Sequence, residues 1–213
     1  MFRIVAMIMA AGSSKRMNGR DKLLLPYKNK TVIEAVIEQF LDHRSIDEVV
    51  VVTSSDDIVS RVQHLPVRLV TGGDERQDSV VSGLTVLKPT DFVLIHDGAR
   101  PFLSADALDR AIEAARQGEP FVLAVPVSDT LKIVADGMVV ETPDRSEYWA
   151  AQTPQGAIVS DLVKAYQQAK TGGEKMTDDS SALERAGFSV AVVPGDHANR
   201  KLTTPEDMRL LCV

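Results

Sequence analysis

The sequence is poor in cysteine, in positive charge and in long apolar runs. A single cysteine among 213 residues, Cys212, excludes an intramolecular disulfide and indicates a reducing compartment, so we expect a cytoplasmic protein. Lys and Arg number 24 against 30 Asp and Glu, a balance unfavourable for a general nucleic-acid binder, which needs clustered basic side chains. The apolar run 1–11 is too short to span a membrane and leads into a glycine loop, which predicts a buried strand and no membrane partner.

Several familiar active-site patterns are also missing. Neither the phosphate-binding pattern GxxxxGK[ST] nor the dinucleotide pattern GxGxxG occurs in the sequence. The P-loop and dehydrogenase interpretations therefore lose their main support. No Ser-His-Asp or Cys-His set stands out either, so nothing predicts a covalent protein nucleophile.

Short apolar runs alternate with amphipathic stretches along the chain. In residues 32–41 the apolar side chains fall on one face at 3.6-residue spacing, which predicts a helix. The runs suited to buried parallel strands are Ile4–Met9, Val49–Thr53, Val67–Val70, Phe92–Ile95, Phe121–Val125 and Val190–Val193. This alternation predicts an α/β fold in which helices sandwich a mainly parallel, twisted sheet. The length fits a single domain over residues 1–213.

Residues Thr130–Thr142 depart from this alternation of apolar runs and amphipathic stretches. They have the pattern of a β-hairpin, two strands around an Asp136-Gly137 turn. An isolated two-stranded ribbon is barely stable in water. We therefore expect residues 129–146 to form an arm that packs against another surface, for which a second subunit is the natural candidate. The alternative is a hairpin that folds back onto its own domain.

In α/β sheets, ligands bind where the strands end. After the first run, the small residues Ala10, Ala11 and Gly12 let the backbone approach a ligand, and N–H groups there can hold phosphate oxygens. Arg16 and Lys22 add positive charge at the same place. Taken alone, a glycine turn with nearby basic residues is equally typical of a solvated turn.

The loops after the third and fourth runs carry further polar residues. In the first of these loops Asp74 and Ser79 offer an acceptor and a hydroxyl to a nucleobase, although the stretch is also typical of a helix start with an acidic first turn. Asp97 follows a buried strand, where a carboxylate is well placed for Mg²⁺. Arg100 could hold an anionic substrate in a fork geometry. We expect His96 to be structural, because no nucleophile or metal partner accompanies it.

Five segments in a fixed order carry a family resemblance. They are Ala10–Met17 with Lys22, Gly72–Val80, His96–Phe102, Thr153-Pro154-Gln155 and Asn199-Arg200-Lys201. Over essentially the whole chain, the sequence resembles the 2-C-methyl-D-erythritol 4-phosphate cytidylyltransferases of the non-mevalonate isoprenoid pathway. The resemblance implies a Rossmann-like α/β fold of the nucleotide-diphospho-sugar transferase type and a homodimer joined by exchanged hairpin arms. It also implies that, with Mg²⁺, CMP passes from CTP to methylerythritol phosphate and pyrophosphate leaves.

The resemblance also assigns roles by motif position. The catalytic residues around the phosphates would be Arg16, Lys22 and Lys201, and Asp97 would bind Mg²⁺. The CTP-binding residues would be Ala10, Ala11, Gly12, Ser14, Gly73, Asp74, Ser79 and Gly98. The sugar-phosphate-binding residues would be Arg100, Thr130, Arg145, Thr153 and Thr177, with Thr130 and Arg145 reaching a neighbour's site. The family often has glycine in place of Ser14 and alanine in place of Gly98, departures that leave the charged residues unchanged.

Three alternatives remain at this point. A ribitol 5-phosphate cytidylyltransferase would share these motifs and differ in its acceptor pocket. A molybdopterin or sugar-1-phosphate nucleotidyltransferase would use another nucleotide, although Asp74 beside a base and little room next to Ala10 and Ala11 favour a pyrimidine. A non-catalytic nucleotide-binding module predicts a degraded phosphate site, yet the charged residues of that site are all present: Arg16, Lys22, Asp97 and Lys201.

Overall fold

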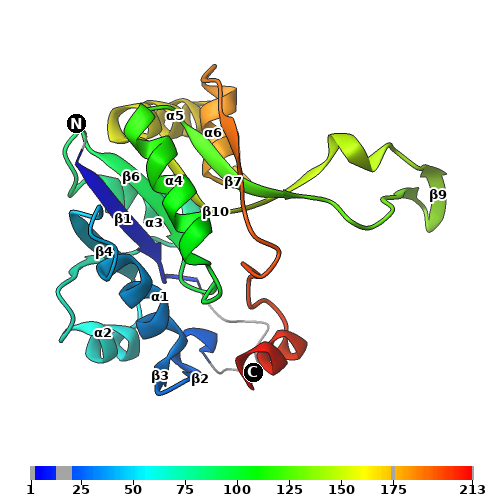
Figure 1. Cartoon of the computed structure of the whole chain (residues 1–213). Helices are drawn as coiled ribbons and strands as arrows, with labels where there is room; N and C mark the ends of the chain where they lie inside the picture. Colours follow the sequence, from blue (N-terminus) through cyan, green and yellow to red (C-terminus); the bar gives the residue numbers. More distant parts are fainter. Residues whose placement is uncertain (1–2, 13–20, 174–175, 213) are drawn as a thin grey trace.

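The centre of the fold is one seven-stranded sheet (Figure 1). The computed structural model describes residues 3–12, 21–173 and 176–212. The strand order is β11-β7-β10-β6-β1-β4-β5. The strands are β1 (Ile4–Met9), β4 (Glu48–Thr53), β5 (Arg68–Thr71), β6 (Phe92–Asp97), β7 (Phe121–Pro126), β10 (Trp149–Ile158) and β11 (Ala191–Pro194). Each of the six predicted apolar runs coincides with a strand of this sheet to within two residues at either end, which confirms the mainly parallel α/β fold.

Strand β10 is the exception to the parallel arrangement, and sequence analysis missed it. It pairs antiparallel with both β6 and β7. Its middle reads Gln152-Thr153-Pro154-Gln155, which has no apolar alternation, and proline normally argues against an interior strand. The pairing with β7 shifts register between Ala151 and Gln155, so the proline lies in an irregular part of the ladder.

One face of the sheet is covered by α1 (Val32–Leu41), α2 (Asp56–Val62) and α4 (Ala105–Gln117). Helix α1 begins at a capping box in which Thr31 and Glu34 satisfy each other's backbone N–H groups. Its apolar face, including Ile33 and Phe40, is fully buried. The predicted helix over residues 32–41 is therefore confirmed.

The other face is covered by α3 (Arg76–Leu84), α5 (Val159–Gly172) and α6 (Asp179–Arg185). Their buried side chains, such as Val80 and Leu162, pack against β1 and β4 in a second apolar core. Across the described residues, no helix combines the length and the apolar character needed to cross a membrane.

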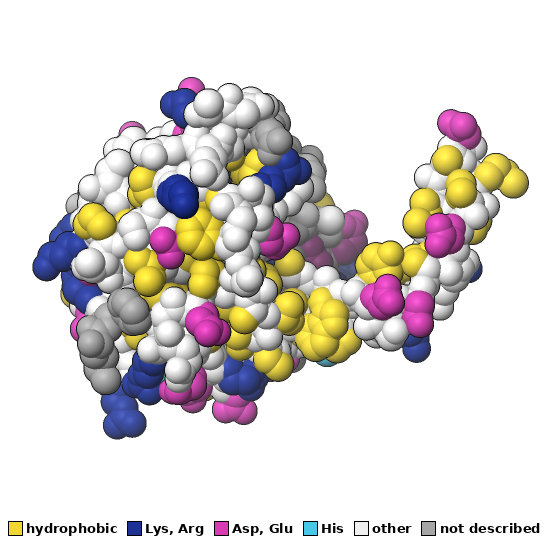
Figure 2. Space-filling model, turned by 90° about the horizontal axis from the view of Figure 1, so that it is seen from above, with side chains coloured by type: hydrophobic (Ala, Val, Ile, Leu, Met, Phe, Trp, Pro, Cys, Tyr) yellow, Lys and Arg dark blue, Asp and Glu magenta, His cyan; other side chains and the backbone are white. Residues whose placement is uncertain are grey.

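The hairpin of β8 (Ile133–Ala135) and β9 (Met138–Glu141) stands far from the body of the chain (Figure 1). Asp136 and Gly137 turn the chain with φ of 49° and 77°, as a tight hairpin turn requires. Every residue of the two strands is exposed, and Figure 2 shows apolar side chains along the arm. Among the described residues, the hairpin thus does not fold back onto its own domain, and its apolar side chains stay exposed.

Short elements complete the chain. The 3₁₀ turn η1 (Lys22–Leu24) and the small hairpin of β2 (Pro26–Tyr27) and β3 (Lys30–Thr31) precede α1. The 3₁₀ turn η2 (Arg145–Glu147) lies between the arm and β10. The chain ends in the 3₁₀ helix η3 (Pro205–Cys212), which packs against the same core as α1.

Candidate active site

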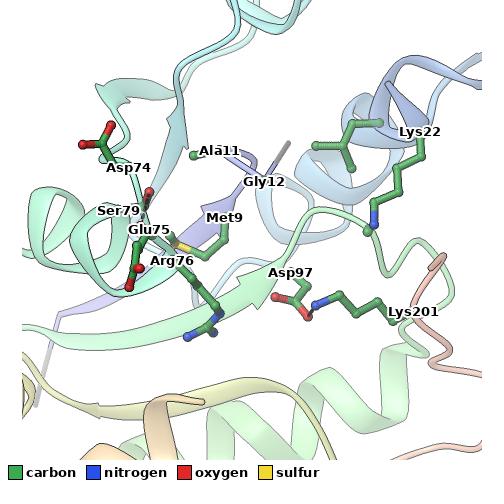
Figure 3. Close-up of a pocket in the computed structure, with 12 residues that line it drawn as sticks. Met9, Ala11, Gly12, Lys22, Asp74, Glu75, Arg76, Ser79, Asp97 and Lys201 are labelled. Atoms are coloured by element: carbon green, nitrogen blue, oxygen red, sulfur yellow. Dashed lines mark hydrogen bonds and ion pairs between the residues drawn. The ribbon is translucent and has the colours of Figure 1, made fainter. Parts of the chain in front are cut away.

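A cavity of about 370 Å³ opens at the carboxyl ends of the central strands (Figure 3). Segments from five parts of the chain meet there, as expected for an α/β sheet. The lining residues are Met9, Ala11, Gly12, Lys22, Leu23, Asp74, Glu75, Arg76, Ser79, Asp97, Ala99 and Lys201. Seven of the predicted site residues are therefore brought together: Ala11, Gly12, Lys22, Asp74, Ser79, Asp97 and Lys201.

Asp97, the last residue of β6, is the charged centre of the cavity. Lys201 Nζ lies 2.9 Å from Asp97 Oδ2, and Arg100 Nε donates to the same oxygen at 3.4 Å. Burial alone would raise the pKa of Asp97, but the positive charges of Lys201, Arg76 and Arg100 outweigh it and hold the pKa well below its ordinary value. Asp97 is therefore ionised at any pH at which the protein would work.

A hydrogen-bonded chain beneath Asp97 fixes its backbone. The Thr153 hydroxyl accepts from the Asp97 N–H at 3.0 Å and lies 3.1 Å from His96 Nδ1. His96 Nε2 lies 3.2 Å from the carbonyl oxygen of Arg100. That oxygen can only accept, so Nε2 carries the proton and Nδ1 accepts from Thr153. Burial lowers the pKa of His96 to about 4, so its ring is neutral and structural.

This arrangement changes the interpretation of Thr153, which sequence analysis assigned to the sugar phosphate. Thr153 is 4% exposed, and its hydroxyl both donates and accepts within the protein. In this geometry the Thr153 hydroxyl supports Asp97 from below, and Thr153 is not among the residues that line the cavity.

Thr153→Val is expected to destabilise the fold by about 1–3 kcal/mol, because it leaves the Asp97 N–H and His96 Nδ1 buried without a partner. The midpoint of thermal unfolding should fall by several degrees, and Thr153→Ser should restore it. A Thr153→Val protein with unchanged thermal stability and a raised KM for the sugar phosphate would instead make Thr153 a direct ligand.

Lys201 reaches Asp97 because the residues on either side of it are anchored. Asn199 is fully buried and donates from Nδ2 to the Thr153 carbonyl oxygen at 2.8 Å. Leu202 is fully buried, and its N–H donates to the carbonyl oxygen of Ala99 at 2.8 Å. The exposed stretch between these anchors therefore has to pass over the cavity.

Lys22 enters the cavity from a different segment. Asp21 caps η1 by accepting from the Leu23 N–H at 3.0 Å, and the Leu23 side chain is buried. Figure 3 shows the ammonium groups of Lys22 and Lys201 pointing into the same space, on the side where Asp97 lies. Two cations held by separate segments suit a ligand with several phosphate groups.

The loop after β5 forms the opposite wall. A Cβ atom at Gly72 would stand 2.4 Å from Ala11 Cβ, so only glycine lets this loop approach the loop after β1. The Ser79 hydroxyl accepts from the Gly73 N–H at 3.0 Å and fixes the turn. The loops after β1 and β5 are therefore in contact at Gly72, and both contribute lining residues to the cavity.

The remaining predicted residues lie around or away from the cavity. Ala10, Gly73 and Gly98 adjoin lining residues without lining it themselves. Arg100 is mostly buried and donates from Nε to Asp97 and from Nη1 to the Asn199 carbonyl oxygen. Thr177 is exposed just before α6, and Thr130 and Arg145 are exposed on the arm. Ser14 and Arg16 lie outside the described residues.

Sequence reasoning overlooked the lining residue Arg76. Its guanidinium binds Asp179 through both Nη atoms, at 3.0 and 2.5 Å, and Tyr166 donates to Asp179 as well. The signal available in the sequence was the acidic pair Asp178-Asp179 next to a predicted site residue. The pair could not be recognised from the sequence, because 103 residues separate Arg76 from Asp179.

Comparisons with known proteins agree on one family. A sequence model of the family described as 2-C-methyl-D-erythritol 4-phosphate cytidylyltransferase matches residues 4–211. Proteins of that name from Clostridioides difficile and Symbiobacterium thermophilum are 41% and 43% identical, covering 95% and 97% of this chain and 90% of each relative. The crystal structure of the Thermus thermophilus cytidylyltransferase matches with a TM-score of 0.84 at 30% identity, covering 99% of this chain and 97% of that one. The Anaerococcus prevotii 4-diphosphocytidyl-2C-methyl-D-erythritol synthase matches with a TM-score of 0.87 at 32% identity, covering 99% and 94%.

Proposed function

Because the chain belongs to the 2-C-methyl-D-erythritol 4-phosphate cytidylyltransferase family, we propose that the cavity at the strand ends is where its two substrates react. The enzyme transfers CMP from CTP to methylerythritol 4-phosphate, giving 4-diphosphocytidyl-2-C-methyl-D-erythritol and pyrophosphate, in isoprenoid biosynthesis. The assignment of the cavity rests on the buried Asp97 carboxylate, which forms an ion pair with Lys201 and shares the cavity with Lys22.

The family match decides between the alternatives. It favours methylerythritol phosphate over ribitol phosphate as the acceptor, and CTP over the nucleotides of related transferases. It also removes the non-catalytic nucleotide-binding module, because the relatives are named as transferases.

The reaction needs positioning and charge neutralisation more than covalent catalysis. A phosphate oxygen of the acceptor attacks the α-phosphorus of CTP in line, the bond to the bridging oxygen of the β-phosphate breaks, and pyrophosphate carries that electron pair away. The acceptor phosphate is already a nucleophile, so no protein base has to take a proton. Lys22 and Lys201 would stabilise the charge that grows on the α-phosphate and the leaving oxygen.

Magnesium would be held mainly by the nucleotide. The described residues contain no group of three or more His, Cys, Asp or Glu side chains arranged as a metal cage. One buried carboxylate, Asp97, fits Mg²⁺, which takes one or two carboxylates together with substrate phosphates. Bound there, the ion would neutralise phosphate charge and orient the leaving group.

The choice of acceptor is tested by pyrophosphate release. The enzyme should release pyrophosphate from CTP with Mg²⁺ when methylerythritol 4-phosphate is present. Ribitol 5-phosphate offered in parallel should give no release above that of CTP alone. Release with ribitol 5-phosphate only would overturn the assignment.

We propose further that residues 129–146 are an arm exchanged between two subunits of a homodimer. Support comes from apolar side chains of the arm that the described part of the chain leaves exposed, with Met138 71% and Val140 65% exposed. Arg145 and Thr130, the predicted acceptor ligands, lie with this arm and do not line their own cavity. An exchanged arm would bring them to the partner's cavity, where Arg100 and Thr177 would complete the acceptor site. The lone cysteine suits the cytoplasm as the compartment.

Mixing two inactive variants tests the exchange. Arg145→Ala damages the arm, and Lys22→Ala damages the cavity. In a mixed dimer with exchanged arms, one of the two sites combines an intact cavity with an intact arm. Random reassociation of equal amounts should therefore restore about a quarter of wild-type activity. If each arm served its own cavity, the mixture would show no gain over the separate variants.

A further inference from the structure

A buried ionic cluster joins helix α3 to helix α6 beside the cavity. Asp179 is 1% exposed and accepts from both Nη atoms of Arg76. The Tyr166 hydroxyl donates to Asp179 Oδ1 at 2.5 Å. Arg76 is the first residue of α3 and Asp179 is the first residue of α6, so the cluster ties two helix starts together.

The charges in this cluster are matched. Burial alone would lower the pKa of Arg76, but the Asp179 carboxylate outweighs it and raises that pKa. Burial and Asp179 together raise the pKa of Tyr166, so its hydroxyl keeps its proton and donates it. A buried carboxylate is costly unless donors satisfy both oxygens, and here they do. Asp179 and Tyr166 are buried, and the Arg76 side chain, 34% exposed, extends from them to the cavity.

The location of the cluster links it to the reaction. Arg76 lines the cavity, and its charge contributes to lowering the pKa of Asp97. Figure 3 shows Arg76 and Lys201 on opposite sides of the Asp97 carboxylate. The start of α3 carries Ser79, on the nucleotide side of the cavity, and Thr177 precedes α6 on the proposed acceptor side.

A second contact supports the same geometry. Gln155 of β10 donates from Nε2 to Asp178 Oδ2 at 2.9 Å and accepts from the Ser180 N–H at 2.7 Å. This amide connects the start of α6 to the sheet. The Arg76–Asp179 pair connects the start of α6 to the start of α3.

We propose that Asp179 and Tyr166 are positioning residues that hold Arg76 beside Asp97 and fix the acceptor-side loop relative to the nucleotide-side loop. The proposal rests on the placement of both substrates in the cavity. A two-pronged arginine–carboxylate pair sets orientation as well as distance. Small displacements of binding groups reduce the rate steeply, because the reacting atoms must be aligned.

Asp179→Asn keeps the side-chain shape and removes the charge. It should raise KM for both CTP and methylerythritol 4-phosphate and lower kcat/KM by about tenfold. Tyr166→Phe removes one hydroxyl and should act in the same direction by about threefold. In an Arg76→Gln background, Asp179→Asn should cost little more, because both changes remove the same contact.

Asp91 is the matched control. It is 2% exposed and also bound by an arginine, Arg3 Nη1 at 3.0 Å from Asp91 Oδ2, but it lies before β6, at the far end from the cavity. Asp91→Asn should lower the midpoint of thermal unfolding and leave both KM values unchanged. The proposal is overturned if Asp179→Asn behaves in the same way, or if its effect adds to that of Arg76→Gln.

Tyr166→Phe preserves the test if Asp179→Asn does not fold. An unchanged KM for both substrates in Tyr166→Phe would then count against the positioning role. Wild-type enzyme in the same assay separates the two levels of inference. A wild type without CTP-dependent turnover rejects the proposed site, whereas active wild type with unaffected cluster variants rejects only the positioning role.

Discussion

Lys22→Ala is expected to lower kcat by about 10²–10³-fold while the fold stays intact. Lys22 lines the cavity, and its ammonium group points into it (Figure 3). Its removal deletes a donor for the charge that develops on the α-phosphate during transfer. The fold should survive because the buried side chain of this turn is that of Leu23. Lys201→Ala should share the loss of turnover.

Lys28→Ala is the matched control for this change. Lys28 lies over the Tyr27 ring at 5.2 Å and is not among the cavity-lining residues. Its φ is 53°, which lysine and alanine tolerate equally, so the backbone effect should be small. Steady-state pyrophosphate release at saturating concentrations of both substrates measures the difference in kcat. If Lys22→Ala turned over at the wild-type rate, Lys22 would have no part in the reaction.

Asp97→Asn should produce a comparably large loss of turnover together with a loss of stability. The neutral amide leaves Lys201, Arg76 and Arg100 close together without the carboxylate that compensates them. The free energy of unfolding should fall by about 3 kcal/mol, the usual cost of breaking a buried pair. The dependence of turnover on Mg²⁺ should weaken, and an unchanged Mg²⁺ titration would remove Asp97 as a metal ligand.

The pH dependence of stability provides an independent check on Asp97. The pKa of Asp97 is depressed in the folded state, so its stabilising contribution is fully present above the unfolded pKa of about 4. That contribution is lost as the pH falls through the lower, folded value. The difference in unfolding free energy between wild type and Asp97→Asn should therefore be constant above about pH 5 and shrink below about pH 4. A difference that grows as the pH falls would contradict this sign.

The sequence was enough to predict the sheet except for one strand. Strands such as β1 and β6 are buried on both sides, so they show as continuous apolar runs. Strand β10 shows no such pattern because hydrogen bonds to β6 and β7 hold it, and its polar middle supports Asp97. Non-local pairing of that kind leaves no local signal.

The site was predictable as a set of loops but not as a set of contacts. Topology brings strand ends together, so Lys22 and Asp97 could be placed at the site from their positions, whereas Lys201 was added by the family resemblance. Which side chains face the cavity depends on packing between distant segments. Thr153 therefore lies beneath Asp97 and outside the cavity lining. Arg76 lines the cavity and is bound by Asp179, which is 103 residues away in the sequence.

A crystal structure of the enzyme with CTP and Mg²⁺ tests the assignment of the cavity most directly. We predict the cytosine between the loops that carry Ala11 and Asp74, and the phosphates between Lys22, Asp97 and Lys201. A second hollow lies beside α4, and its lining includes Arg44, Arg110 and Arg116 together with Asp109 and Glu113. CTP bound there, with the cavity at Asp97 empty, would contradict the proposed site.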